Sequence, residues 1–305
     1  MEPTPRDSLS PSPVAAPPGT GVRVRCWGTR GSIPSPGPAT AGYGGNTPCV
    51  EVRVGEQRVV FDAGSGMRLL GLDVQEESRP ADVTIFLSHF HWDHIQGFPF
   101  FAPLYQPEAR LRIVGPAQQD MDVRSLFAGQ MGPIYFPVPF SAVAATATFD
   151  HLNEGTWEEG GIRVSAMRVR HPSFTVGYRL EAEGRTLCYV PDNELVGASH
   201  ETADRWRERF TRFVGGADVL IHDAMYTDEE YASKEGWGHS TFRQAVELAA
   251  DAGVRRLLFF HHAPERSDAA LTAIVRARRK EADALGLGLE VDAASEGVDL
   301  TLDAR

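Results

Sequence analysis

Four side chains that commonly bind metal ions fall within six consecutive residues of this chain. His89, His91, Asp93 and His94 lie in the segment SHFHWDHIQG, and imidazole and carboxylate groups are preferred ligands of zinc and related divalent ions. In an extended segment His89 and His91 point to the same side, whereas a turn that begins at Asp93 directs Asp93 and His94 towards a second point. We therefore predict that this one segment begins two metal sites.

Each site needs further ligands, and three candidates stand at the ends of expected strands elsewhere in the chain. They occur in the segments VRHPSF, YVPDNE and LLFFHHAPERSD, as His171, Asp192 and His261. In the last segment His261 is favoured over His262, because alternate residues of a strand face opposite sides. The predicted ligands are His89, His91 and His171 for one site and Asp93, His94 and His261 for the other, with Asp192 bridging both.

Such a centre is typical of hydrolases. Two divalent ions about 3.5 to 4 Å apart activate a water molecule as the nucleophile. Zinc is the expected metal, and the same ligand set accepts manganese or iron. Asp93 is expected to serve catalysis as well as metal binding. An isolated histidine is more often an ordinary core or surface residue, but the HxHxDH pattern after an apolar strand favours metal binding.

His239 is a candidate of a different type, since the segment GWGHST places it just before a helix that starts near Thr241. Backbone N–H groups at the start of a helix favour an anion, and an imidazole at that point could protonate a leaving alkoxide. We favour this catalytic interpretation over the alternative that His239 only caps or packs.

The remaining histidines carry weaker signals. His222 ends an apolar strand beside Asp223, where it either orients a metal ligand or is a hydrogen-bonded core histidine. His262 is expected to support its neighbour or the fold. His151 and His200 lie in polar loop sequence, and we expect both to be solvated.

Hydrophobic patterning predicts an α/β chain with two mixed sheets packed face to face and helices outside. Helices are expected at 241–252, where Thr241 and Gln244 form a capping-box pattern, and at 267–285. The segments LGLEVD and GVDLTL are expected to pair as strands at the end of the chain. The aromatic segment 132–140 is either a substrate-facing loop or a packed surface loop. Further strands are predicted at 22–28, 50–55, 57–64, 82–88, 110–114, 162–170, 175–181, 185–190 and 217–221.

Composition argues against several classes of function. The formal net charge of −11 gives no general attraction to nucleic acid or anionic membranes, and no run approaches the roughly 18 apolar residues of a membrane span. The three cysteines, Cys26, Cys49 and Cys188, form no CxxC pair and indicate a reducing compartment. We expect a cytoplasmic protein, with residues 1–21 as a disordered proline-rich tail and residues 22–305 as one hydrolase domain.

The chain resembles the metallo-β-lactamase superfamily from about residue 22 to the C-terminus. The matching features are HFHWDH, the downstream residues His171, Asp192 and His261, and the FDAG segment at 61–64. The resemblance implies an αββα sandwich with a dinuclear metal site at the edge between its sheets. It also implies that Asp62 supports the histidine cluster.

Within that superfamily the chain resembles the phosphodiesterase branch that includes ribonuclease Z, phosphoribosyl cyclic phosphodiesterase and cyclic nucleotide phosphodiesterases. The segment GTRGSIPSPGPATAGYGGNTPC, the GHST motif and the HH pair at 261–262 carry this likeness. The branch suggests a homodimer and a carboxylate that assists His239, for which Asp223 is the candidate. Asn46 and Thr47 in the GGNT segment are candidates for contact with phosphate or sugar.

One departure from ribonuclease Z bears on the substrate. That family carries a long tRNA-binding arm between the ligands that match His171 and Asp192, which here lie only 21 positions apart. Together with the acidic charge, the short gap favours a small phosphodiester, above all a cyclic nucleotide, over long nucleic acid. The alternatives are hydrolysis of a lactone or thioester at the same centre, RNA processing like that of ribonuclease Z, and a non-catalytic nucleotide-binding metal scaffold.

Overall fold

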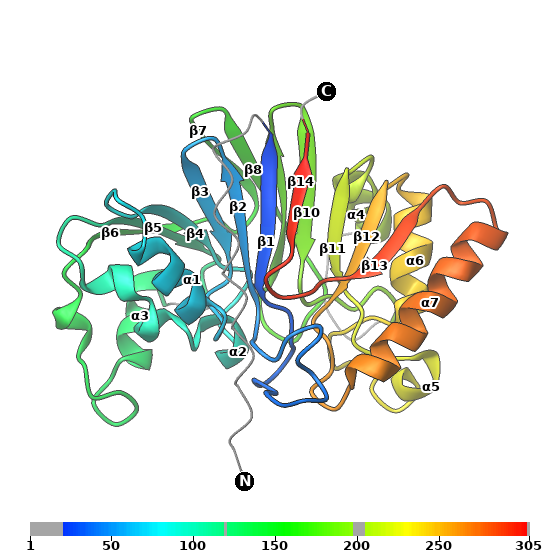
Figure 1. The fold of residues 1–305 in the computed structure, drawn as a ribbon, viewed down its shortest axis with the longest axis horizontal. Coiled ribbons are helices and arrows are strands. Elements are labelled where there is room, and N and C mark those ends of the chain that lie inside the picture. The colour runs from blue at the N-terminus through cyan, green and yellow to red at the C-terminus, as the bar shows by residue number, and fades with distance from the viewer. Residues whose placement is uncertain (1–20, 119–120, 198–204, 304–305) are drawn as a thin grey trace, which may run out of the picture.

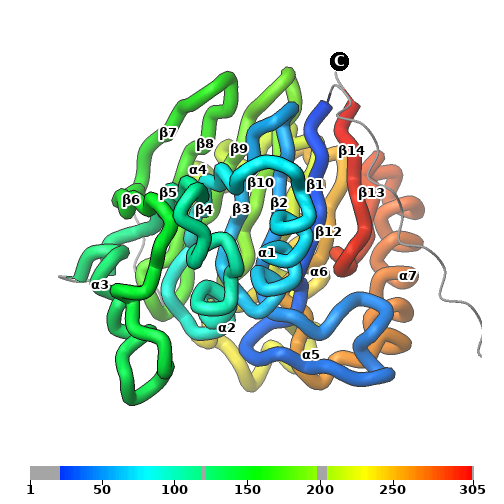
Figure 2. The backbone as a smooth tube through the Cα atoms, turned by 60° about the vertical axis from the view of Figure 1, so that its left-hand side comes forward, coloured from blue at the N-terminus to red at the C-terminus, as the bar shows by residue number. Residues whose placement is uncertain are grey.

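The protein forms two seven-stranded sheets packed face to face, with helices on both outer faces (Figure 1). The computed structural model describes residues 21–118, 121–197 and 205–303, so His200 and almost all of the tail expected at 1–21 lie outside the described residues. A view turned by 60° shows α1 in front of one sheet and α7 beyond the other (Figure 2). This αββα arrangement confirms the predicted fold class.

The first sheet has the strand order β14-β1-β2-β3-β4-β5-β6. Strands β3 to β6 pair in parallel, whereas β14, β1, β2 and β3 pair antiparallel. Buried and half-buried residues alternate along β1, as expected for a strand with one face on the core. The strands span Val22–Gly28 (β1), Cys49–Val54 (β2), Gln57–Phe61 (β3), Asp82–Phe86 (β4), Arg110–Gly115 (β5), Thr146–His151 (β6) and Asp299–Leu302 (β14).

The second sheet has the strand order β13-β12-β11-β10-β9-β8-β7. Here β10 to β13 pair in parallel, and β7 to β10 form an antiparallel meander. All five residues of β11 are buried, because helices cover one face of the sheet and the first sheet covers the other. The strands span Gly155–Glu159 (β7), Ile162–Arg168 (β8), Val176–Ala182 (β9), Arg185–Val190 (β10), Val219–Asp223 (β11), Arg256–Phe260 (β12) and Glu290–Ala293 (β13).

Helices α1 and α3 lie beside the first sheet, and α4, α6 and α7 lie beside the second (Figure 1). Helix α6 starts with the predicted capping box, in which Thr241 accepts from the backbone of Gln244 and Gln244 accepts from that of Thr241. The helices span Met67–Gln75 (α1), Trp92–Ile95 (α2), Val123–Gln130 (α3), Trp206–Val214 (α4), Asp228–Tyr231 (α5), Phe242–Asp251 (α6) and Asp268–Ala284 (α7), with short 3-10 turns at Phe98–Phe100, Ala102–Tyr105 and Phe140–Ala142.

Aromatic side chains fill the space between the two sheets. Phe61 of the first sheet stacks on Tyr178 and Tyr189 of the second, with ring centroids 5.5 and 5.2 Å apart. All three are fully buried. Tyr178 donates to the carbonyl of Leu87 at 2.6 Å, and Tyr189 donates to the carboxylate of Asp62 at 2.8 Å. The core therefore holds in place the two segments that lead into the histidine cluster.

The prediction that the last two strands pair with each other is wrong. β13 pairs with β12 in the second sheet, whereas β14 pairs with β1 in the first. The chain crosses between the sheets at residues 294–298, where the carboxylate of Glu296 accepts from the backbone and side-chain nitrogens of Asn46 at 2.6 and 2.9 Å. Two short apolar runs separated by turn residues are typical of a hairpin, so the local sequence could not reveal this crossing.

Several longer elements were not predicted, namely α1, α3, α4, β6 and β7. Gly71 lies in the middle of α1 and weakens its helical signal, but the helix needs it because an added Cβ would lie 2.9 Å from the backbone nitrogen of Ala102. No residue of β6 or β7 is buried, so neither strand carries the run of core residues that marks the other strands. His151 ends β6 instead of lying in a loop, although its side chain is exposed as expected.

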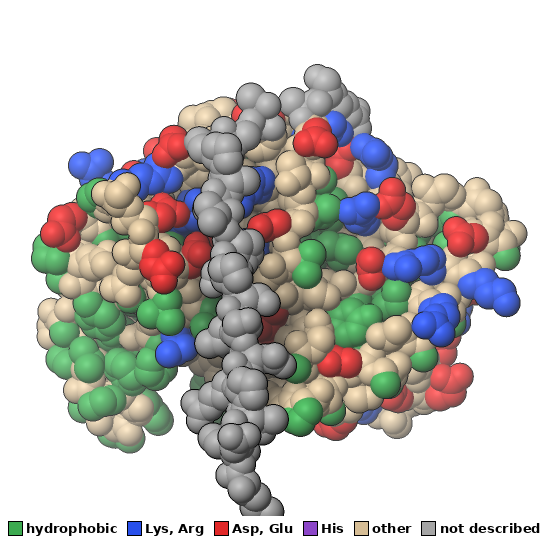
Figure 3. Space-filling view, viewed as in Figure 1, with side chains coloured by type: hydrophobic (Ala, Val, Ile, Leu, Met, Phe, Trp, Pro, Cys, Tyr) green, Lys and Arg blue, Asp and Glu red, His purple; other side chains and the backbone are tan. Residues whose placement is uncertain are grey.

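Apolar side chains are exposed on the outside of the first sheet, next to α3 (Figure 3). Within the segment 132–140, Ile134 and Tyr135 are 88% and 78% exposed, while Phe136 packs edge-on against Phe100 at 5.4 Å. The segment is thus partly packed and partly open to solvent. No helix among the described residues is long and apolar enough to cross a membrane.

We predict that Phe61→Ala lowers the free energy of unfolding by about 3 to 5 kcal/mol, because it opens a cavity between two buried tyrosine rings. Urea denaturation followed by circular dichroism measures the change. Leu285→Ala, at a side chain that is 67% exposed, is the control and should alter stability by less than about 0.5 kcal/mol. Equal effects of the two substitutions would contradict the assigned core.

Candidate metal centre

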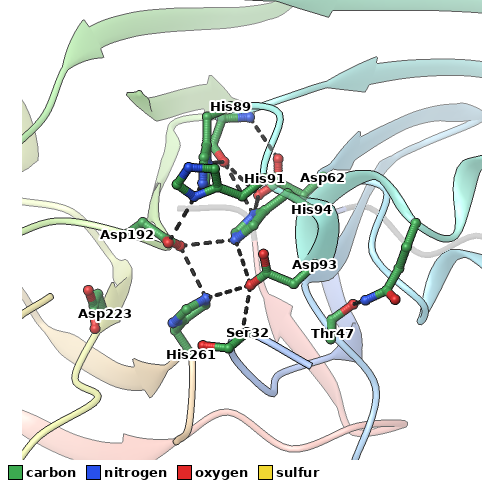
Figure 4. Close-up of polar contacts among 12 residues, drawn as sticks. Ser32, Thr47, Asp62, His89, His91, Asp93, His94, Asp192, Asp223 and His261 are labelled. Carbon is green, nitrogen blue, oxygen red and sulfur yellow. Dashed lines mark hydrogen bonds and ion pairs between the residues drawn. The ribbon is translucent and has the colours of Figure 1, made fainter. Parts of the chain in front are cut away.

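The candidate ligands converge at one edge of the sandwich, where parallel strands end. β3 and β4 run parallel in the first sheet, and β10, β11 and β12 run parallel in the second. Asp62 follows β3, the segment 88–94 follows β4, Asp192 lies just beyond β10 and His261 follows β12. Figure 4 shows Asp192 and His261 facing Asp93 and His94 across this edge. The fold thus gathers distant polar residues at the carboxyl ends of its strands.

The short helix α2 explains how one segment serves two groups of ligands. His91 has an extended backbone, with φ −64° and ψ 152°, and is the N-cap of α2. Asp93 and His94 then lie within the helix and are both buried. The change from extended to helical backbone turns their side chains away from the direction of His89 and His91.

The first ligand group consists of His89, His91, His171 and Asp192, whose ligand atoms all lie within 4.8 Å of one another. The Nε2 atom of His171 lies 3.1 Å from Nδ1 of His91 and 3.5 Å from Oδ2 of Asp192. The same carboxylate oxygen lies 3.8 Å from Nε2 of His89. These four residues therefore surround one point.

The second ligand group consists of Asp93, His94 and His261, again with all ligand atoms within 4.8 Å. Oδ2 of Asp93 lies 3.3 Å from Nε2 of His94 and 3.1 Å from Nε2 of His261. The other oxygen of Asp192, Oδ1, lies 3.1 Å from His94 and 3.4 Å from His261 (Figure 4). Asp192 thus turns one oxygen to each group, which is the geometry of a bridging ligand.

The chemistry of both groups fits divalent ions. His89 Nε2, His94 Nε2 and Asp192 Oδ1 are buried without a well-formed hydrogen bond, and such atoms are costly unless something binds them. Burial lowers the pKa of His89 well below its usual value and lowers the pKa of His171 to about 3, so both imidazoles stay neutral as metal ligation requires. Although burial alone would protonate Asp192, His261 and His94 hold its pKa well below the usual range.

Asp62 supports this centre from behind. Its carboxylate accepts from Nδ1 of His94 at 2.8 Å, from the backbone nitrogen of Ser88 at 2.7 Å and from the hydroxyl of Tyr189 at 2.8 Å. A hydrogen bond at Nδ1 fixes the tautomer of His94 and leaves Nε2 for a metal ion. The resemblance to known proteins suggested Asp62, but nothing in the sequence pointed to Ser88 or Tyr189.

The loop after β1 closes over the second ligand group, and this contact was not predicted. The backbone nitrogen of Ser32 donates to Oδ2 of Asp93 at 2.8 Å. An added Cβ on Gly31 would lie 2.4 Å from Nδ1 of His261, so only glycine allows this approach. Asp268 in α7 holds the far end of the loop through the backbone nitrogens of Gly42 and Tyr43, at 2.6 and 3.2 Å. Every residue except proline has a backbone N–H group, so the residue type of Ser32 could not predict this contact.

His239 lies beside both groups and is paired with Asp223. Its Nδ1 atom lies 2.9 Å from Oδ2 of Asp223, and its ring centroid is 4.9 Å from that of His261 and 5.3 Å from that of His171. Burial opposes protonation, but the Asp223 carboxylate outweighs it and raises the pKa of His239 to about 9. Asp223 is itself held by the backbone nitrogens of Asn193 and Met225. This arrangement suits a proton donor at the edge of the centre.

Two weaker histidine candidates are core residues that contact no ligand directly. The ring of His222 lies 2.6 Å from the carbonyl oxygen of Asp223 and 3.2 Å from the side-chain nitrogen of Asn193. His262 lies 2.9 Å from the carbonyl oxygen of Ala294, and its ring packs edge-on against that of Tyr43. Burial lowers the pKa of His222 to about 4 and that of His262 to about 3.

Asn46 and Thr47 are committed to contacts within the protein. Asn46 is bonded to Glu296, and its side-chain oxygen accepts from Ser65 at 3.1 Å. The hydroxyl of Thr47 accepts from the backbone of Ser65 and from the side chain of Gln96, at 2.8 and 2.9 Å. Figure 4 shows Thr47 set apart from the ligands. Their contact with phosphate or sugar stays a prediction that this geometry does not favour.

Comparison with known proteins places this site in context. A family model described as "Beta-lactamase superfamily domain" matches residues 57–262. A ribonuclease Z from Streptococcus thermophilus is 26% identical over 247 residues, which covers 66% of this chain and 78% of that protein. The metallo-β-lactamase fold protein YhfI from Bacillus subtilis has a TM-score of 0.65 at 20% identity, covering 92% of this chain and all of that one. The short form of human tRNase Z has a TM-score of 0.62 at 20% identity, covering 91% and 98%.

The two oxygens of Asp192 lead to a prediction about metal content. Asp192→Ala should reduce both bound ions, because it removes a ligand from both groups, whereas His91→Ala should weaken one ion and retain the other. Mass spectrometry of metals in dialysed protein, with metal titration by calorimetry, measures this difference. Asp73→Asn, at a partly exposed carboxylate of α1, is the control and should keep both ions. Full retention of both ions in Asp192→Ala would refute the bridging assignment.

Proposed function

Because this chain belongs to the metallo-β-lactamase superfamily, whose domain model matches residues 57–262, we propose that it hydrolyses a small phosphodiester, with a cyclic nucleotide as the expected substrate. At the coarser level it is a metal-dependent hydrolase with that fold. The choice of a small phosphodiester as substrate depends on His239, which lies next to the ligands, and on the short segment between His171 and Asp192.

The placement of His239 carries the proposal. Cleavage of a phosphodiester expels an alkoxide, which needs a proton as it leaves. His239 lies beside both ligand groups, and its Nδ1 atom is engaged by Asp223, so Nε2 is the nitrogen that would meet the leaving oxygen. The high pKa of about 9 keeps this imidazole protonated near neutral pH, as a general acid requires.

Each remaining residue has a definable task. Bound divalent ions would supply Lewis-acid activation of water and neutralise charge on the phosphoryl group. His89, His91 and His171 would hold one ion, and Asp93, His94 and His261 the other. Ser32 keeps Oδ2 of Asp93 in place through its backbone nitrogen.

RNA processing is the second candidate, since ribonuclease Z proteins are the relatives found at 26% identity. The short segment between His171 and Asp192 is evidence against RNA processing. Most of that segment is β9 and β10, which a tight turn through Glu183 and Gly184 joins, so it contains no long insertion that could serve as an RNA-binding arm. The formal net charge of −11 also disfavours a long polyanion.

A turnover screen of metal-analysed protein tests the proposal. Substrates should include 3′,5′- and 2′,3′-cyclic nucleotides, phosphoribosyl cyclic phosphate, bis-nitrophenyl phosphate, an RNA with a 3′ extension, and lactones. Turnover of cyclic nucleotides with the highest kcat/KM supports the proposal. Turnover confined to RNA or to lactones overturns it, as would tight nucleotide binding without any turnover.

For His239→Ala we predict a fall in kcat on phosphodiesters of about 100-fold to 10,000-fold, because the leaving oxygen loses its proton donor. Metal content should stay unchanged, and hydrolysis of an activated lactone should fall far less. His151→Ala, at an exposed histidine in β6, is the control. Loss of a metal ion in His239→Ala would make His239 a ligand and contradict its role as an acid, since its nitrogen also lies within 4.8 Å of Asp192 and His261.

A further inference from the structure

Two tryptophans next to the metal centre are exposed. Trp92 is 82% and Trp237 is 60% exposed, although tryptophan is usually well covered in folded proteins. The other three tryptophans lie elsewhere in the chain, and Trp206 is buried while Trp27 and Trp157 are half-buried. Exposure of this side chain is therefore confined to the residues beside the candidate site.

One metal ligand connects the two tryptophans. Trp92 directly follows His91, whose Nδ1 lies 3.1 Å from Nε2 of His171. Trp237 directly precedes Gly238, whose carbonyl accepts from Nδ1 of the same imidazole at 3.0 Å. Since consecutive Cα atoms are about 3.8 Å apart, each tryptophan lies one residue from a group that touches His171. Both tryptophans thus belong to the residues that border the centre.

The loop that carries Trp237 is fixed. Gly236 and Gly238 flank the tryptophan with φ of 85° and 87°, a conformation that other residues rarely adopt. An added Cβ on Gly238 would lie 2.3 Å from Nδ1 of His171. The buried carboxylate of Glu194 accepts from the backbone nitrogens of Gly236 and Gly238 at 2.7 and 3.2 Å. The backbone therefore holds Trp237 at this position.

The backbone of Trp92 is also held in place. It is the first residue of α2, and its carbonyl accepts from the backbone nitrogen of Gln96 at 2.8 Å. The side chain of Gln96 is anchored on Thr47 in turn. Because the backbone is held at both positions, a flat ligand that binds against the rings has to order only the two side chains.

The charged side chains around the site bear on how a ligand would bind. In the part of the chain that the structure describes, no lysine or arginine forms an ion pair with Asp93, Asp192 or Asp223. The cationic side chain of Lys234 lies instead against aromatic rings, with Nζ 5.9 Å from the ring centroid of Trp237 and 4.5 Å from that of Tyr226. Stacking on aromatic rings is independent of charge and contributes substantially to the binding of nucleobases.

From these observations, and given the phosphodiesterase function proposed above, we propose that Trp92 and Trp237 form a subsite for the nucleobase of the substrate. The base stacks on the tryptophans while the single phosphodiester meets the metal ligands. The two residues determine specificity through KM and take no part in bond breaking.

Kinetics on a matched pair of substrates tests this subsite. The pair is adenosine 3′,5′-cyclic phosphate and methyl ribofuranoside 3′,5′-cyclic phosphate, which lacks the base. Trp92→Ala and Trp237→Ala should each raise KM for the nucleotide about 10-fold with kcat little changed, and should leave KM for the base-free diester unchanged. Trp→Phe at either position should restore most of the affinity. Leu285→Ala, another exposed apolar side chain, is the control.

Tryptophan fluorescence supplies a readout that does not depend on activity. Adenosine 3′,5′-cyclic phosphorothioate should quench the fluorescence of the metal-loaded protein, and the quenching should vanish in the double variant Trp92→Phe, Trp237→Phe. Absence of quenching in the wild type overturns the subsite, as does an equal change in KM for both substrates. A dimer that dissociates on Trp92→Ala, seen by sedimentation, would assign the rings to a second copy of the chain instead.

The two proposals fail separately. If the wild type hydrolyses no phosphodiester, the proposed function fails, and the fluorescence titration still decides whether the rings bind a base. If both diesters are hydrolysed with the same KM and the tryptophan variants behave as the wild type, the subsite is wrong while the phosphodiesterase function stands.

Discussion

The carboxylate of Asp192 is the interaction on which the centre depends. It is 2% exposed, and each of its oxygens faces a different group of imidazoles. A buried charge of this kind is unfavourable unless cations or donors surround it. Asp62 and Asp93 add two more buried carboxylates within the same region. Divalent ions between these groups would balance that charge. Bound metal ions would therefore explain why so many carboxylates are buried in one region.

Two of the residues that form or support the centre have a strained backbone conformation. Asp62 and His261 have φ of 60° and 56°, a left-handed conformation that residues other than glycine rarely adopt, and both sit directly after a strand. Their hydrogen bonds and packing hold them in place: Asp62 accepts from three residues, and His261 lies against Gly31. Function is thus concentrated at strand ends, where the regular hydrogen-bond pattern stops.

The sequence predicted most of what is local in this site. His89 to His94 could be proposed as ligands because their spacing is set by one strand and one turn, and His171, Asp192 and His261 because each stands near the end of a predicted strand. Contacts made by the backbone, such as that of Ser32 with Asp93, have no signature in residue type. The sequence also could not predict that β13 and β14 join different sheets. Each pairs with an edge strand, β12 or β1, and the local sequence does not show where those edges lie.

The loop after β1 has a consequence for biosynthesis. It is formed early in the chain, yet its hydrogen-bond partners are Asp268 and Glu296, more than 200 residues later. A growing chain emerges from its N-terminus, so this loop cannot gain those contacts until α7 and the crossing to β14 have been made. The candidate metal ligands of the nascent protein therefore lack this cover until residues 268–296 have been synthesised.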